Sequence, residues 1–183
     1  MAALIYIVDT LCSLYIGLYI LRFLMQLVRA DFRNEVSAAI VKLTNPLILP
    51  LRRVLPPVGK VDTASIVAIL LLTFGKIVLL RWLVGYLMPT LIGWILLLVF
   101  TVIVDVLWVL CWCVVLSALI GLLTQGARTV VTYLLDAICE PVLRPFRRHI
   151  PELIKGFDLS YLWATIAIQA LIILINTTIL PRI

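Results

Sequence analysis

Four long apolar runs constrain this chain more than any other feature of its sequence. They cover Leu4–Val28, Ala64–Met88, Leu91–Leu123 and Leu159–Leu180. A helix of about 20 apolar residues crosses the hydrocarbon core of a bilayer, whereas the strands of a membrane barrel are about ten residues long and alternate between apolar and polar side chains. The runs are longer than such strands and do not alternate. They predict an all-α membrane protein with four transmembrane helices.

The composition agrees with this fold class and not with a soluble globular domain. Hydrophobic residues make up 64% of the 183 positions, the mean hydropathy is +1.23 and only 13% of residues are charged. Soluble domains are close to half apolar. The third run is longer than one bilayer thickness, so its helix has to tilt, kink or begin outside the hydrocarbon.

Basic residues gather in two of the three connections between the runs. Eleven of the 15 lie there: Arg29, Arg33, Lys42, Arg52, Arg53 and Lys60 in the first connection, and Arg128, Arg144, Arg147, Arg148 and Lys155 in the third. Short loops rich in lysine and arginine stay on the cytoplasmic side of a membrane. We therefore expect a plasma-membrane protein with both basic loops in the cytoplasm and both termini outside.

Each basic loop begins with an amphipathic stretch. Apolar residues recur at helical spacing over Asn34–Leu43 and again over Gly126–Ile138. Such stretches form helices that lie in the membrane interface. A short helix folded back over its own bundle would show the same pattern, and the sequence does not separate these two arrangements.

The second half of the chain repeats the first. At an offset of 95 residues, Asn45–Pro46 aligns with Glu140–Pro141, Pro50–Arg53 with Pro145–Arg148, and Pro56 with Pro151. At an offset of 96, Asp62 aligns with Asp158 and Ile7–Leu11 with Ile103–Leu107. Each unit crosses the membrane twice, so both units have the same orientation. We expect two units, residues 1–88 and 89–183, related by a pseudo-two-fold axis along the membrane normal.

The repeated prolines and aspartates have local structural roles. Proline lacks an N–H and disfavours helix in the residue before it, so the prolines are expected to end the amphipathic helices and hold an extended loop. They are Pro46, Pro50 and Pro56, and Pro141, Pro145 and Pro151. Asp62 and Asp158 each precede a span, where a carboxylate caps the free N–H groups of a helix start.

The doubled motif P-[LF]-R-R-x-[LI]-P, followed each time by a glycine, an aspartate and an apolar span, resembles the YggT family of bacterial and plastid membrane proteins. The resemblance covers nearly the whole chain, although Tyr161 stands where the family commonly has a proline. It implies an accessory or assembly factor. Plastid relatives are linked to maturation of a cytochrome complex, and some bacterial relatives to cell division or osmotic tolerance.

Asp9, Lys76, Arg81 and Asp105 are ionisable residues inside the spans. Charged groups are costly in a bilayer, so they point to function or to pairing. Counted by helix rise from the inner ends of their spans, the two aspartates and Arg81 share one layer near the outer interface, with Lys76 nearer the middle. We expect an ion-paired cluster that joins the two repeats. It is interpreted as a structural clasp, with a proton or cation path as the alternative.

Enzymatic activity is not expected. The single histidine, His149, cannot form a catalytic dyad, a zinc site or a bis-histidine haem site within one chain. Cys111 and Cys113 are two residues apart on a helix and point to roughly opposite faces. We therefore predict no metal site and no cofactor.

The leading hypothesis is a scaffold that presents two basic loops side by side. Arg52, Arg53, Arg147 and Arg148, with Lys60 and Lys155, would bind anionic lipid head groups or an acidic protein partner, and nucleic acid is not an expected partner. The alternative for the arginines is that they only set the topology. The alternative function is a transport or ion-homeostasis component, and self-association stays open for both.

Overall fold

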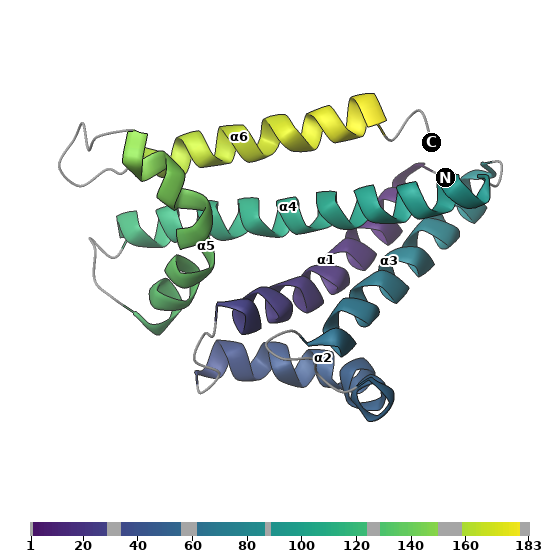
Figure 1. Cartoon of the computed structure of the whole chain (residues 1–183), viewed down its shortest axis with the longest axis horizontal. Coiled ribbons are helices and arrows are strands. Elements are labelled where there is room, and N and C mark those ends of the chain that lie inside the picture. Colours follow the sequence, from purple (N-terminus) through teal and green to yellow (C-terminus); the bar gives the residue numbers. More distant parts are fainter. Residues whose placement is uncertain are drawn as a thin grey trace.

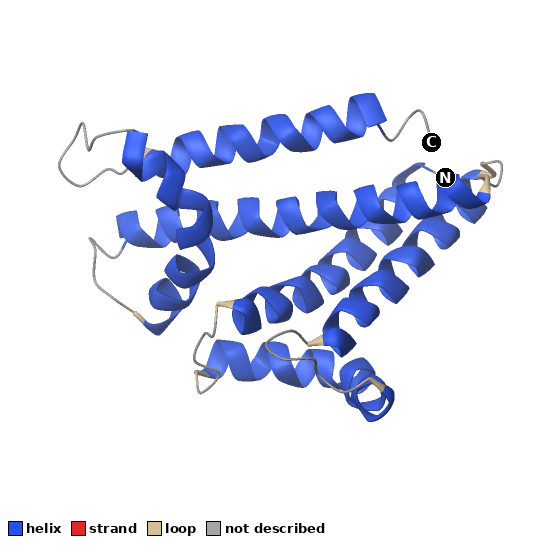
Figure 2. Ribbon diagram, in the orientation of Figure 1, coloured by secondary structure: helices blue, strands red, loops and turns tan. Residues whose placement is uncertain are grey.

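The computed structural model describes residues 2–28, 34–55, 62–86, 89–123, 129–149 and 159–179. Figure 2 shows that the regular structure in these residues is helical throughout. The elements are α1 (Ala2–Leu27), α2 (Glu35–Val54), α3 (Thr63–Val84), α4 (Leu91–Leu123), α5 (Val130–His149), α6 (Ser160–Leu174) and a π-helical turn η1 (Ile175–Ile179).

The four predicted spans are confirmed as helices that are long and apolar enough to cross a membrane. They are α1, α3, α4 and the continuous helix formed by α6 and η1. The second span ends at Val84 rather than Met88, because Gly85 adopts a left-handed conformation with φ of 78°. The Gly85 N–H donates to the Arg81 carbonyl at 2.9 Å and closes the helix there.

The third span is the longest element. With 33 residues, α4 is about 50 Å long at about 1.5 Å per residue, against a hydrocarbon core about 30 Å thick. It is straight enough in Figure 1 to rule out a sharp kink as the means of shortening it. Its length therefore requires tilt or extension beyond the hydrocarbon.

The order span, amphipathic helix, span occurs twice (Figure 1). The chain enters α1 and leaves α6 at one end of the molecule, and α2 and α5 lie toward the other end. α1 and α4 therefore run in the same sense, as expected for parallel repeats. The halves meet where α4 packs against both α1 and α3.

Both amphipathic helices pack on their own bundles. α2 buries Ser37, Ile40, Thr44 and Ile48 against α1 and α3. α5 lies against α4 and α6 and buries Leu134, Leu135, Ile138, Cys139 and Leu143. Both helices therefore fold back over their bundles, and α2 also leaves Val36, Leu43 and Leu49 exposed, as a helix in the membrane interface does.

The prediction that prolines end these helices is wrong for the four inner prolines. α2 continues through Pro46 and Pro50, and α5 continues through Pro141 and Pro145. In each helix the two prolines are four residues apart and exposed, so the missing N–H groups and the ring clashes fall on one outer face. Proline at such a place bends a helix rather than ending it. Figure 1 shows α2 changing direction along its length.

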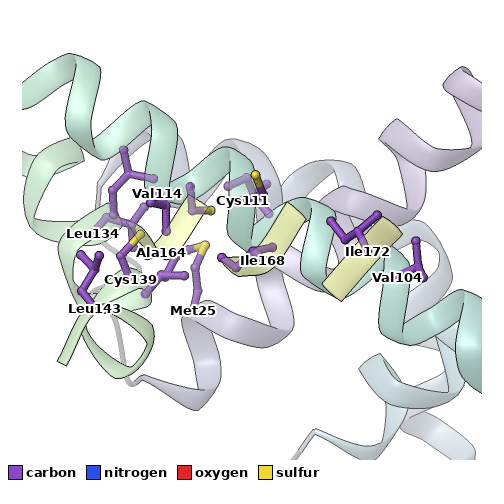
Figure 3. Packing of buried hydrophobic residues seen from close by; sticks show 14 of the residues in the cluster. Met25, Val104, Cys111, Val114, Leu134, Cys139, Leu143, Ala164, Ile168 and Ile172 are labelled. Carbon is purple, nitrogen blue, oxygen red and sulfur yellow. The ribbon is translucent and has the colours of Figure 1, made fainter. Parts of the chain in front are cut away.

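The two halves have separate apolar cores. In the first half, Ile16, Tyr19 and Ile20 of α1 pack with Ile48 of α2 and with α3. In the second half, α4, α5 and α6 form a larger cluster that includes Cys111, Val114 and Cys139. Figure 3 shows Met25 of α1 inserted among the side chains of this second cluster. That insertion joins the two repeats toward the end of the molecule where α2 and α5 lie.

Candidate functional site

A buried ion pair connects the two repeats within the spanning helices. Nζ of Lys76 in α3 donates to both carboxylate oxygens of Asp105 in α4 at 3.0 Å, and to Oγ of Ser13 in α1 at 3.2 Å. The side chains of Lys76 and Asp105 are only 7% and 11% exposed. The expectation that a charge pair would tie the repeats together is met by these two residues.

The other two predicted members of the cluster lie close by. Asp9 and Arg81 line a cavity of about 890 Å³ that Lys76 and Asp105 also line. Among the described residues, Asp9 is in no ion pair. Toward the α5 end the cavity wall becomes apolar and includes Trp108 and Trp112 of α4. It is therefore polar at one end and apolar along most of its length.

The depth prediction placed Lys76 nearer the middle of the membrane than Asp105, with a side chain long enough to reach toward the layer of Asp105. The two side chains are in direct contact.

The first arginine of the first pair fastens α2 to the start of α3. Nη2 of Arg52 donates to Oδ2 of Asp62 at 2.6 Å, and Oγ of Ser65 donates to the same oxygen at 2.9 Å. Burial alone would raise the pKa of the Asp62 carboxyl, but the hydrogen bonds from Arg52 and Ser65 and the charges of Arg52 and Arg22 outweigh it, so this pKa lies below its usual value.

Asp62 does occupy the N-cap position of α3, as predicted, but its role there is different. Its side chain makes no capping hydrogen bond to the backbone. The carboxylate is instead committed to Arg52 and Ser65. Its counterpart Asp158 lies outside the described residues, as do Lys60, Lys155, Pro56 and Pro151.

The first arginine of the second pair makes an equivalent connection. Nη2 of Arg147 in α5 donates to Oη of Tyr161 in α6 at 3.2 Å, and its guanidinium lies 5.7 Å from the centre of that ring. Nη1 donates to Glu140 at 2.9 Å. At the repeat offset Tyr161 corresponds to Ser65, so in both halves an arginine joins the amphipathic helix to the first turn of the next span.

The second arginines, Arg53 and Arg148, are exposed, and within the part of the chain that the structure describes neither takes part in an ion pair. The expected single patch of four arginines does not form. Figure 1 places the carboxy-terminal turns of α2 and α5, which carry the pairs, on opposite sides of the molecule. Each helix packs outside its own bundle, and this separates the two pairs.

One charged residue was missed by the sequence reasoning. Arg22 of α1 is 5% exposed, and its Nη1 donates to Oγ1 of Thr44 at 2.6 Å and to Oδ1 of Asn45 at 3.0 Å. Both acceptors belong to α2. An arginine inside an apolar run, spaced to face an amphipathic helix, was the available signal.

Neither half assembles a metal centre from its described residues, because no three histidine, cysteine, aspartate or glutamate side chains come together there. Cys111, Cys113 and Cys139 are buried as free thiols in the apolar core. Burial raises the pKa of the Cys139 thiol, which keeps this side chain protonated and unreactive.

Comparison with known proteins identifies relatives over almost the full length. The model of the CCB3/YggT family matches twice, at residues 1–83 and 91–179. An uncharacterized protein of Pseudomonas aeruginosa is 38% identical over 94% of this chain and 88% of its own. The protein YggT of Escherichia coli K12 is 36% identical over 87% of this chain and 82% of its own.

A third relative, an uncharacterized protein of Vibrio alginolyticus, is 35% identical over 92% of this chain and 91% of its own. No solved structure matches the chain. The two family matches fall on the two halves that carry the arginine motif, the packed amphipathic helix and the pair of spans. This chain is a multi-pass membrane protein that belongs to the CCB3/YggT family.

Proposed function

We propose that this protein is a non-enzymatic membrane accessory or scaffold protein that binds anionic lipid head groups or an acidic protein partner. The observation that carries the proposal is a difference between the two arginines of each pair. Arg52 and Arg147 are engaged in contacts inside the fold. Arg53 and Arg148 are the next residues, and both are exposed.

The chemistry of arginine supports this role. A guanidinium binds phosphate and carboxylate groups through two parallel hydrogen bonds and keeps its charge at any physiological pH. Arg53 and Arg148 lie at the ends of helices that are fixed on the bundle, so little freedom is lost when they bind. Because α2 and α5 are separated, we propose two independent contact points rather than one continuous platform. The positive-inside rule places both at the cytoplasmic surface.

The test compares three proteins in native membranes: the wild type, Arg53→Gln with Arg148→Gln, and Arg53→Lys with Arg148→Lys. Crosslinking followed by affinity purification and lipid analysis measures what each retains. The glutamine variant is expected to lose the partner or the enrichment in anionic lipid, and the lysine variant to retain only part of it. Unchanged retention, with the topology intact by cysteine labelling, would rule out the proposal.

The cavity between the spans favours a second candidate function, transport or ion homeostasis. Asp9, Lys76, Arg81 and Asp105 all line this cavity of about 890 Å³, and ionisable groups at membrane depth commonly mark an ion or proton path. Asp9→Asn and Asp105→Asn distinguish the functions. If the protein is a transporter, these variants would lose flux in proteoliposomes while remaining folded. If the charges form only a structural clasp, the variants would lose thermal stability in detergent, and neither they nor the wild type would show flux.

A further inference from the structure

A second, smaller pocket lies between α1 and α2, and neither Arg53 nor Arg148 is among its lining residues. Its volume is about 560 Å³, and Arg22, Gln26, Lys42, Asn45 and Arg52 line it together with the small side chain of Ala38. The polar lining therefore consists of three cations and two amides. None of the lining residues is acidic.

The guanidinium of Arg22 forms the floor of this pocket, and hydrogen bonds to α2 hold it in place. Its hydrogen bonds to Thr44, to Asn45 and to the Val41 carbonyl at 3.3 Å all come from Nη1. Across the described ranges no acceptor takes a hydrogen bond from its Nε or Nη2, and those two N–H groups form the edge of the guanidinium that binds an oxyanion in bidentate fashion. The α2 contacts thus orient the side chain and leave that edge for another group.

The charges around the pocket are only partly balanced. Asp62 compensates Arg52 through their ion pair. Of the residues that the structure describes, no carboxylate lies within ion-pair distance of Arg22 or Lys42. Asp62 is the carboxylate whose charge acts on Arg22, and it is already paired with Arg52. Three cations line the pocket for this one carboxylate, and Arg22 is only 5% exposed, so an anion that enters the pocket is favoured.

We propose that this pocket binds a phosphate group, supplied by an anionic phospholipid of the adjoining leaflet. Arg22 would bind the phosphate oxygens from below and Lys42 from the rim. The inference rests on the proposed function only in placing α2 at the inner surface of the membrane. It concerns a different site. There the guanidinium of Arg22 is buried and held by α2, whereas Arg53 and Arg148 are exposed.

Two features favour a lipid over free phosphate. Arg22 lies five residues before the end of α1, about 8 Å by helix rise, which is the depth of head groups rather than of bulk water. α2 also exposes Val36, Leu43 and Leu49 beside the pocket, and these side chains match the acyl-chain boundary. The cavity is larger than a bare phosphate needs and leaves room for a glycerol backbone.

The experiment uses the full chain in mild detergent and native mass spectrometry. The probes are phosphatidylglycerol, phosphatidylcholine and inorganic phosphate. The wild type is expected to retain one phosphatidylglycerol per chain in preference to phosphatidylcholine, with inorganic phosphate unable to displace it. Lys42→Gln removes one exposed charge and is expected to weaken phosphatidylglycerol binding about tenfold, as one lost charge-assisted hydrogen bond would.

Two further variants separate the pocket from general charge. Ala38→Phe keeps every cation and fills the pocket, and it is expected to abolish retention. Arg53→Gln removes an equal charge from the same helix outside the pocket, and it is expected to leave retention unchanged. Both Lys42 and Ala38 are exposed, so folding is expected to persist and is checked by the unfolding temperature.

Three results would overturn the inference. The first is equal retention of phosphatidylglycerol by the wild type and Lys42→Gln. The second is an equal loss of phosphatidylglycerol in Lys42→Gln and Arg53→Gln. The third is displacement of the lipid by inorganic phosphate, which would make the site one for free phosphate. The outcome is independent of the crosslinking test with Arg53 and Arg148, so either proposal can fail while the other stands.

Discussion

The two repeats share one topology and are held together by different chemistry. In the first, charged groups are buried between helices, with Arg22 joining α1 to α2 and Lys76 joining α3 to the second repeat. At the repeat offset of 96, Ala118 and Ile172 stand at those two positions. The second repeat relies on the apolar cluster around Cys139 and Leu143 instead (Figure 3). Both proposed intramolecular sites therefore occur once per chain, although the fold is doubled.

What the halves keep in common is the arginine that joins the amphipathic helix to the following span. Arg52 donates to Asp62, which also accepts from Ser65, and Arg147 donates to Tyr161. The partner differs, from a buried carboxylate to a half-buried phenol, but the elements joined are the same. This contact follows from the topology that the repeats share, whereas Lys76 and Arg22 have no counterpart in the second repeat.

The largest expected effect comes from making the first repeat resemble the second at Lys76. Lys76→Ile leaves Asp105 buried without its cation, and removing one partner of a buried pair costs about 3–5 kcal/mol. The double variant Lys76→Ile with Asp105→Leu removes both charges and is expected to recover most of that loss. Thermal unfolding in detergent measures both. A single variant as stable as the wild type, or a double variant no better than the single, would contradict the clasp.

The next prediction compares equivalent core positions. Ile48 and Leu143 are 95 residues apart, are both fully buried and belong to separate clusters. Truncating either to alanine is expected to cost about 2–5 kcal/mol, and the two losses should add to within about 0.5 kcal/mol because the two side chains belong to separate clusters.

Denaturant or thermal unfolding of the two single variants and the double variant measures this, with the exposed Leu49→Ala as the control that should change little. Strong non-additivity would show that the halves unfold as one packed unit. A large loss from only one of the two alanine variants would instead show that a single repeat carries the stability.

The parts of the fold that the sequence predicts are those encoded by long, local patterns. Each span is a run of apolar residues that only a membrane helix can satisfy, and the repeat fixes the relative sense of the halves. The amphipathic helices were found in the same way, from their spacing. Their ends were not, because the pattern alone does not reveal that Pro46 and Pro50 lie on one outer face where a bend is tolerated.

The site was predicted less completely, because pairing depends on how the helices meet. Lys76 and Asp105 were identified by being charged in a span, but which of four charges would pair depends on the tilt and length of α4. The prediction that the two arginine pairs form one patch rested on the symmetry of the repeats alone. It did not take into account that α2 and α5 pack on separate bundles. Arg22 carried the same signal as Lys76 and should have been included.

A moderate effect is expected at Asp62. Asp62→Asn removes the charge that Arg52 and Ser65 bind and is expected to cost about 1–3 kcal/mol. The pKa of this carboxyl is lowered in the folded protein, so its stabilisation is full above the ordinary carboxyl value of about 3.9 and is lost as the pH falls through the lower folded value.

The unfolding temperature of the wild type, followed from pH 6 to below about pH 4, should therefore fall more steeply than that of Asp62→Asn. The matched variant in the other half is Tyr161→Phe, which removes a contact at an exposed site and should change neither stability nor its pH dependence by much. Parallel acid profiles for the wild type and Asp62→Asn would mean that the carboxylate is not held as described.

The smallest stability effects are expected for the second pair of arginines, and they separate structure from binding most sharply. Arg147→Gln loses a contact with Glu140, whose side chain is 53% exposed, and such surface pairs are worth about 0–1 kcal/mol. Arg148→Gln loses no described ion pair and should stay within about 0.5 kcal/mol of the wild type. If Arg148 binds an anionic head group or an acidic partner, Arg148→Gln nevertheless reduces the amount of lipid or partner captured from native membranes. Arg147→Gln leaves Arg148 in place and is expected to reduce this amount less. The reverse order, in which capture follows stability rather than exposure, would assign both arginines to the fold and leave the carboxy-terminal ends of α2 and α5 without a binding role.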